Sequence, residues 1–112
     1  MELKNRYVLH IPLSRFQKGS MVRLNIDSIL EDLLCDLEGD GLYMTRAEGR
    51  YRSRAYDELL ITVFSNTQRP GEAFRQWFLK NNDYLGQEAF AYELNNTLVV
   101  EGCPKTNMPS PT

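Results

Sequence analysis

Alternating apolar positions mark the first predicted strand, over residues 7–13 (YVLHIPL). In an extended chain, successive side chains point to opposite faces, so every second residue shares a face. The apolar face carries Tyr7, Leu9, Ile11 and Leu13. Pro12 lacks an amide proton, which is typical of an edge strand, a bulge or a strand end. Residues 14–24, with Gly19 at their centre, are predicted to be a loop.

The pattern in the middle of the chain predicts a β-hairpin whose second arm continues into a central strand. Residues 41–47 (GLYMTRA) read as a strand, and Glu48-Gly49 are placed at the hairpin tip. The chain then returns through the apolar run at 59–64 (LLITVF). Its length and β-branched content are typical of a central strand covered on at least one face.

Helical spacing of apolar residues appears twice. Residues 26–38 carry an apolar stripe at spacings of three and four, which predicts an amphipathic helix. Ser28 with Glu31 fits a capping box, and Asn25 is an alternative cap. A second helix is predicted from Pro70, which suits a first turn, to a point near residues 81–82 (NN). Its aromatic residues are assigned to the core by their spacing, and they are Phe74, Trp77 and Phe78.

The C-terminal pattern indicates a second hairpin. Residues 87–94 and 97–102 read as strands joined by Asn95-Asn96, because asparagine tolerates positive φ. A helix through residues 88–94 is the competing interpretation. Residues 103–112 hold three prolines and no apolar pattern, which predicts a flexible tail. We therefore expect one domain over residues 1–102 and a tail over residues 103–112.

The predicted order is β-α-β-β-α-β-β, so the expected fold class is α+β. Two βαβ halves around a hairpin make a ferredoxin-like sandwich, here with an extra strand. Both helices are expected on one face of an antiparallel sheet.

In this order of elements and in its length, the chain resembles small bacterial ferredoxin-like families, including the PII-like group. One uncharacterised family of this kind shares short motifs with residues 40–42 (DGL), with Gly49, Tyr51 and Arg52, and with residues 87–88 (QE). The resemblance spans residues 7–102. The PII-like comparison implies binding of an anionic small molecule and ring-shaped oligomers. The chain departs from that group because it has no characteristic PII nucleotide motif.

Composition narrows the function classes. The 112 residues are 42% hydrophobic and 25% charged, which is typical of a globular domain. A net charge of −2 gives no overall attraction to nucleic acid or membrane. Two cysteines and one histidine are too few for a zinc site of four protein ligands, and the chain has no glycine-rich phosphate loop and no Rossmann fingerprint, so no metal and no cofactor are expected. Residues 1–15 show no export signal, which predicts a cytoplasmic protein with reduced thiols.

The most distinctive candidate site is the arginine-rich segment at residues 46–54 (RAEGRYRSR), with four arginines and one glutamate. Arginine suits phosphates and carboxylates because two N–H groups meet two oxygens. The predicted anion- or partner-binding residues are Arg46, Arg50, Tyr51, Arg52 and Arg54. Strand parity predicts Arg50, Arg52 and Arg54 on one face. The alternative is a solvated hairpin whose arginines pair with neighbouring acids.

Residues 27–40 carry six acidic residues and no basic one. They read either as the solvated face of an amphipathic helix or as a docking surface. An acidic helix meeting a basic hairpin between subunits would favour a homo-oligomer.

Three functions follow from these patterns. The leading hypothesis is a non-enzymatic binding or regulatory module that takes an anionic small molecule or a protein partner at the hairpin. The second is a cofactor-independent enzyme with His10, Tyr51 and Glu48 near a cleft, since histidine titrates near neutrality. The third, nucleic-acid binding through the hairpin, is disfavoured by the overall acidic charge.

Overall fold

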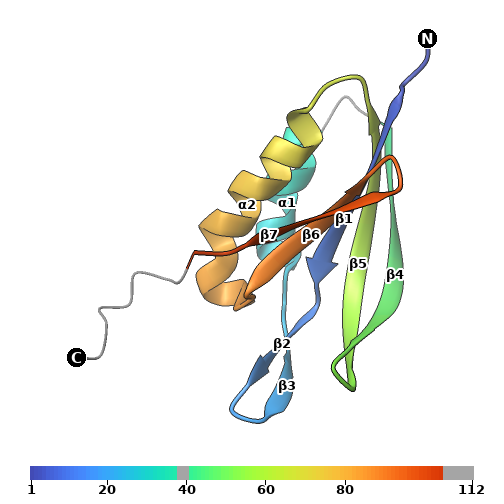
Figure 1. Cartoon of the computed structure of the whole chain (residues 1–112). Coiled ribbons are helices and arrows are strands. Elements are labelled where there is room, and N and C mark those ends of the chain that lie inside the picture. The colour runs from blue at the N-terminus through green and yellow to red at the C-terminus, as the bar shows by residue number, and fades with distance from the viewer. Residues whose placement is uncertain (38–40, 105–112) are drawn as a thin grey trace.

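The computed structural model describes residues 1–37 and 41–104, apart from the side chain of Tyr51. Two helices lie on one side of a β-sheet (Figure 1). The helices are α1 (Asp27–Asp36) and α2 (Arg69–Leu85). The strands are β1 (Asn5–Pro12), β2 (Ser14–Gln17), β3 (Ser20–Arg23), β4 (Gly41–Tyr51), β5 (Arg54–Ser65), β6 (Ala89–Leu94) and β7 (Thr97–Gly102).

The sheet has five strands in the order β4-β5-β1-β6-β7, and every neighbouring pair is antiparallel. The expected α+β class, with both helices on one face of an antiparallel sheet, is confirmed. The run at residues 59–64 lies within β5, between β4 and β1, so its prediction as a central strand is also confirmed.

The core lies between the sheet and the helices. Tyr7, Leu9 and Ile11 of β1 are buried, as the alternation predicted. Three aromatic residues of α2 are buried against them: Phe74, Trp77 and Phe78. The indole Nε1 of Trp77 donates a hydrogen bond to the backbone oxygen of Ile29, 2.7 Å away, and thereby joins α2 to α1. Burying each such side chain stabilises the fold by about 1.5–3 kcal/mol.

Residues 14–24 are not a loop. They form a separate two-stranded hairpin, β2–β3, that turns at Lys18 and Gly19, both with positive φ. The prediction missed it because β3 is exposed along its whole length, so no apolar alternation marks it.

The β4–β5 hairpin turns later than predicted. Its turn lies at Arg52 and Ser53, with φ of 51° and 62°, while Gly49 pairs with Tyr56 inside the ladder. The sequence gives no ordinary turn signal there, since positive φ usually selects Gly, Asn or Asp.

Both helix ends differ from prediction. The first residue before α1 is Ile26 without a side-chain cap, so the Ser28–Glu31 capping box is wrong, and Asn25 Oδ1 instead accepts from the Asp27 amide at 3.2 Å. Helix α2 continues past residues 81–82 to Leu85. The Asn82 side chain is buried there and bonds both backbone groups of Gln87, so it supports the helix end instead of breaking the helix.

The C-terminal hairpin is confirmed, and the competing helix is wrong. Asn95 and Asn96 have φ of 51° and 70° between β6 and β7. The predicted tail begins at residue 103, yet the Cys103 amide donates to the backbone oxygen of Glu88 at 2.8 Å and its side chain packs on the core. The predicted tail otherwise falls on residues 105–112, which lie outside the described residues.

Candidate functional site

The sheet has one face covered by helices and one that no helix of the described chain covers. In an antiparallel ladder, residues directly opposite each other share a face. Tyr7, Leu9 and Ile11 face the helices, so Val8 and His10 lie on the helix-free face. The pairing of Val8 with Thr62 and Glu93, and of His10 with Leu60, extends that face over three strands.

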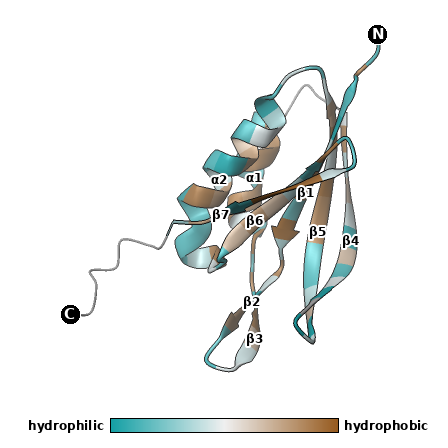
Figure 2. Ribbon diagram, viewed as in Figure 1, coloured by the Kyte–Doolittle hydropathy of each residue, from teal (hydrophilic) through white to brown (hydrophobic). Residues whose placement is uncertain are grey.

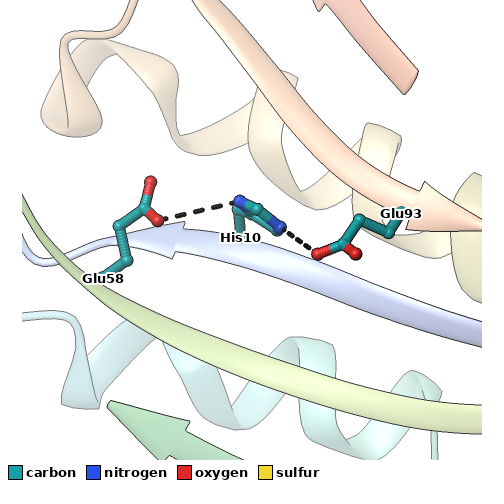
Figure 3. A network of polar contacts seen from close by, with 3 residues as sticks. All are labelled: His10, Glu58 and Glu93. Carbon is teal, nitrogen blue, oxygen red and sulfur yellow. Dashed lines mark hydrogen bonds and ion pairs between the residues drawn. The ribbon is translucent and has the colours of Figure 1, made fainter. Parts of the chain in front are cut away.

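Three polar side chains meet on this face and are named here the His10 cluster: His10, Glu58 and Glu93 (Figure 3). His10 Nε2 lies 2.9 Å from Glu93 Oε2, and His10 Nδ1 lies 3.7 Å from Glu58 Oε2. The strands β5, β1 and β6 supply one residue each. The three side chains are 21%, 30% and 32% exposed, so a molecule in solution reaches them.

Strand register explains why these residues meet. Glu58 pairs with Pro12 and Glu93 pairs with Val8, so each sits diagonally from His10 on a neighbouring strand. Long side chains reach such diagonal neighbours. Gly49 of β4 borders Glu58, where an added Cβ would lie 3.5 Å from Glu58 Oε2. The cluster is therefore a product of pairing across the sheet, with its members 48 and 35 positions apart along the chain.

The cluster offers the hydrogen-bond acceptors of two carboxylates and one imidazole that lies between them. Carboxylates accept hydrogen bonds only, whereas imidazole donates from both nitrogens when protonated. Even with His10 protonated, two carboxylates leave the cluster with a net negative charge. It suits an organic cation or a ligand rich in hydroxyl or amine donors. Within the described part of the chain, no group of three or more His, Cys, Asp or Glu side chains is arranged to hold a metal ion.

The predicted arginine site is only partly assembled. Arg52 lies in the turn, so the shared face for Arg50, Arg52 and Arg54 is wrong. Arg46 and Arg50 pair with odd-numbered residues of β5, whereas Arg54 is an even-numbered residue of that strand. Arg46 and Arg50 therefore lie on the face opposite Arg54. Arg50 Nη2 lies 3.4 Å from Glu48 Oε1. This ion pair is of the kind that the alternative interpretation, a solvated hairpin whose arginines pair with neighbouring acids, predicts. Whether these residues bind an anion stays a prediction.

The enzyme hypothesis grouped His10 with Tyr51 and Glu48. Glu48 pairs with Asp57, the neighbour of Glu58, and so lies on the face opposite His10. That part of the constellation is wrong. The side chain of Tyr51 lies outside the described part of the structure. Sequence reasoning missed Glu58 and Glu93 as partners of His10, since only the register of three strands brings them together.

Burial perturbs two groups elsewhere. Desolvation, with smaller contributions from Tyr92 and Glu72, raises the pKa of Tyr7, whose hydroxyl donates to the Thr67 oxygen at 2.9 Å. Desolvation, followed by the charge of Glu101, raises the pKa of the Cys103 thiol. A raised thiol pKa lowers the thiolate fraction and so argues against a reactive cysteine. Neither described helix has the length and apolar continuity needed to cross a membrane.

Comparisons with known proteins bear on the fold. No protein-family model matches the chain, and no curated protein matches it. Two solved structures are similar. One is a phage SAM lyase in the apo state, with a TM-score of 0.56, 8% identity and 90% coverage of each chain. The other is a phage SAM lyase in complex with S-methyl-5′-thioadenosine, with a TM-score of 0.54, 8% identity and coverage of 88% of this chain and 89% of that one. At such identity the likeness concerns the fold alone.

Proposed function

We propose that this protein is a small-ligand-binding module whose ligand lies on the helix-free face of the sheet, over the His10 cluster. The observation that carries the proposal is the pair of carboxylates, Glu58 and Glu93, that flank a part-exposed histidine. This moves the leading site from the arginine-rich hairpin to the sheet. The hairpin remains a predicted anion or partner surface.

The fold we propose for this module is ferredoxin-like. The strand order β4-β5-β1-β6 supports it, since β1-α1-β4 and β5-α2-β6 then make two interleaved βαβ halves. In this description β2–β3 is an insertion and β7 an added edge strand. Such a sandwich leaves one sheet face free, and that is the face on which the His10 cluster lies.

The chemistry of the cluster favours a nucleoside or a cation. Acidic side chains bind ribose hydroxyls in nucleotide sites by accepting their hydrogen bonds. Tyr56 precedes Glu58 by two residues and so shares its face, where a half-buried aromatic ring is available for a base. S-methyl-5′-thioadenosine, bound by a protein of similar fold, is a nucleoside, and SAM adds a sulfonium cation. These two compounds are therefore the first probes.

The test is calorimetric titration of the whole chain with SAM and with S-methyl-5′-thioadenosine. We expect binding of at least one probe, weakened about tenfold or more by Glu93→Gln, because a charged acceptor contributes about 1.5–3 kcal/mol. Glu101→Gln is the matched control, since Glu101 pairs with Arg75 at 2.7 Å and lies on the helix-covered face. Absence of binding by both probes, or equal loss in both variants, would reject the site.

A cofactor-independent enzyme is the second candidate, favoured by His10 lying between two carboxylates where a general acid or base would be held. The same titration samples are analysed chromatographically for products of SAM. Under this candidate, His10→Gln retains SAM binding and loses turnover. Binding without any product from the unaltered protein would leave the binding module and remove the enzyme.

A further inference from the structure

Positive charge is concentrated in two segments that are distant in sequence. Residues 14–23 carry Arg15, Lys18 and Arg23 with no acid, and residues 46–54 carry four arginines with one glutamate. Each segment is therefore +3 in a chain whose net charge is −2, which leaves −8 on the remaining residues. The charge balance of the whole chain hides this segregation.

The fold places both segments at the same end of the molecule. The β2–β3 and β4–β5 hairpins extend together beyond the helices (Figure 1). The guanidinium carbon of Arg54 lies 3.6 Å from the centroid of the Phe16 ring, so the hairpins touch through a cation–π contact. Nearer the sheet, the Leu13 amide donates to the Asp57 oxygen at 3.0 Å and fixes their relative position.

One face of β2–β3 carries exposed apolar groups beside these cations. The pairs Ser14↔Arg23 and Phe16↔Met21 are two residues apart, so Arg23, Phe16 and Met21 share a face. Phe16 and Met21 are 41% and 37% exposed. Arg15 points elsewhere, since its Nη1 donates to the Tyr84 oxygen at 2.7 Å. The remaining cations of both segments are exposed, namely Lys18, Arg23, Arg46, Arg50, Arg52 and Arg54.

We propose that the two hairpins together form a docking surface for single-stranded nucleic acid. Surfaces of this kind combine cations that follow the phosphate backbone with aromatic side chains and arginine planes on which bases stack. The Phe16–Arg54 stack, with Met21 beside it, is such a platform, and Arg23 shares its face of β2–β3 while Lys18 lies at the turn of that hairpin. In the sequence, residues 46–54 form one basic segment in a chain that is acidic overall. The structure adds the second basic segment and the platform between them.

A single-stranded partner fits better than a folded acidic protein. The apolar part of this surface is confined to a ring and a few aliphatic groups, and Figure 2 shows the turn between β4 and β5 as hydrophilic. A protein interface would need a larger buried apolar centre. Exposed bases require only small stacking platforms and neighbouring charge.

The test is fluorescence anisotropy of a labelled 20-nucleotide oligo-dT with the whole chain. If about four phosphates are neutralised, the counterion-release slope for single strands predicts an affinity roughly 50-fold lower in 200 mM than in 50 mM salt. The double variant Lys18→Gln with Arg23→Gln is expected to weaken binding and to lower the salt slope by about 1.4. Lys4→Gln with Lys80→Gln is the matched control, because it removes two cations that lie outside both hairpins.

A second variant separates stacking from charge. Phe16→Ala is expected to weaken binding about fivefold or more while leaving the salt slope unchanged. Circular dichroism of every variant establishes that it is folded. The proposal is overturned if oligo-dT does not bind in 50 mM salt, or if the control variant loses as much affinity as the hairpin variant. Equal affinity for polyglutamate or for phosphatidylglycerol vesicles, with no effect of Phe16→Ala, would also overturn it.

Discussion

At the scale of single residues, the sheet separates side chains of similar type into different roles. Tyr7 and His10 lie on the same strand three positions apart and point to opposite faces. Tyr7 is 2% exposed beneath the helices, and its hydroxyl has a backbone acceptor. His10 lies between two carboxylates that remain open to solvent. Tyr7 therefore contributes to the stability of the fold, and His10 is part of the proposed binding site.

Tyr7 predicts a loss of stability at alkaline pH. Its pKa is raised above the usual 10.0, mainly by desolvation, so the folded state holds the phenolic proton more tightly than the unfolded chain. This contribution is complete below pH 10.0 and is lost as the pH rises through the folded-state pKa. Tyr7→Phe should cost about 1 kcal/mol near neutrality through the lost hydrogen bond. It should also reduce the further loss above about pH 10. Urea unfolding across pH measures both, and parallel pH profiles for the two proteins would contradict the assignment.

At the scale of secondary-structure elements, the ends and turns of helices and strands were harder to predict than the presence of the elements themselves. Residues 88–94, which contain β6, also allowed a helix, whereas both helices and strands β1 and β5 follow from their apolar patterns. The β4–β5 turn does not, because Arg52 and Ser53 take positive φ without the usual residue types. Hairpin β2–β3 lacks the periodic signal, since β3 is exposed along its whole length and the hairpin is held by backbone pairing and by contacts with distant residues such as Tyr84 and Arg54.

The end of α2 provides a test of this local chemistry. Gly86 adopts φ of 65°, and an added Cβ would lie 3.0 Å from the Arg15 side chain. We expect Gly86→Ala to lower the free energy of unfolding by about 1 kcal/mol, since a left-handed backbone is strained for alanine. Gly41→Ala is the control, because Gly41 has an ordinary φ and no atom within 4 Å of its added Cβ. Denaturant unfolding of both variants would refute this explanation if the two changes were equal.

At the scale of the whole molecule, β7 is an edge strand, and among the described residues no strand pairs with its outer side. The two-residue loop makes Leu94 and Thr97 a hydrogen-bonded pair, so Leu98 and Val100 direct their backbone groups away from β6. Their side chains are 56% and 62% exposed, and Figure 2 shows β7 as largely hydrophobic. Such an edge is a template for strand pairing. An antiparallel copy centred on Val99 would place Leu98 opposite Val100 of that copy and Thr97 opposite its Glu101, without a clash of like charges.

The expected homo-oligomer therefore becomes a specific prediction. We expect a weak dimer through β7, because cross-strand pairs contribute only about 0.2–1 kcal/mol each. Sedimentation analysis over a range of concentrations should detect it in the unaltered protein. Val100→Lys should shift the population to monomer by placing two like charges at the edge, whereas Met21→Lys, on the β2–β3 hairpin, should not. If the unaltered protein stays monomeric at the highest protein concentration measured, the prediction is contradicted.

The amino-acid sequence by itself determined the α+β class, both helices, the aromatic core of α2 and the strands of the five-stranded sheet except β6, for which residues 88–94 also allowed a helix, because local periodicity records which faces are buried. It also showed the arginine-rich segment as a run of charge. The tertiary structure alone decided which side chains meet. His10, Glu58 and Glu93 come together through the register of three strands, and Phe16 meets Arg54 because two hairpins extend from the same end of the sheet. Such contacts join residues separated by tens of positions, and local periodicity carries no information about the pairing that brings them into contact.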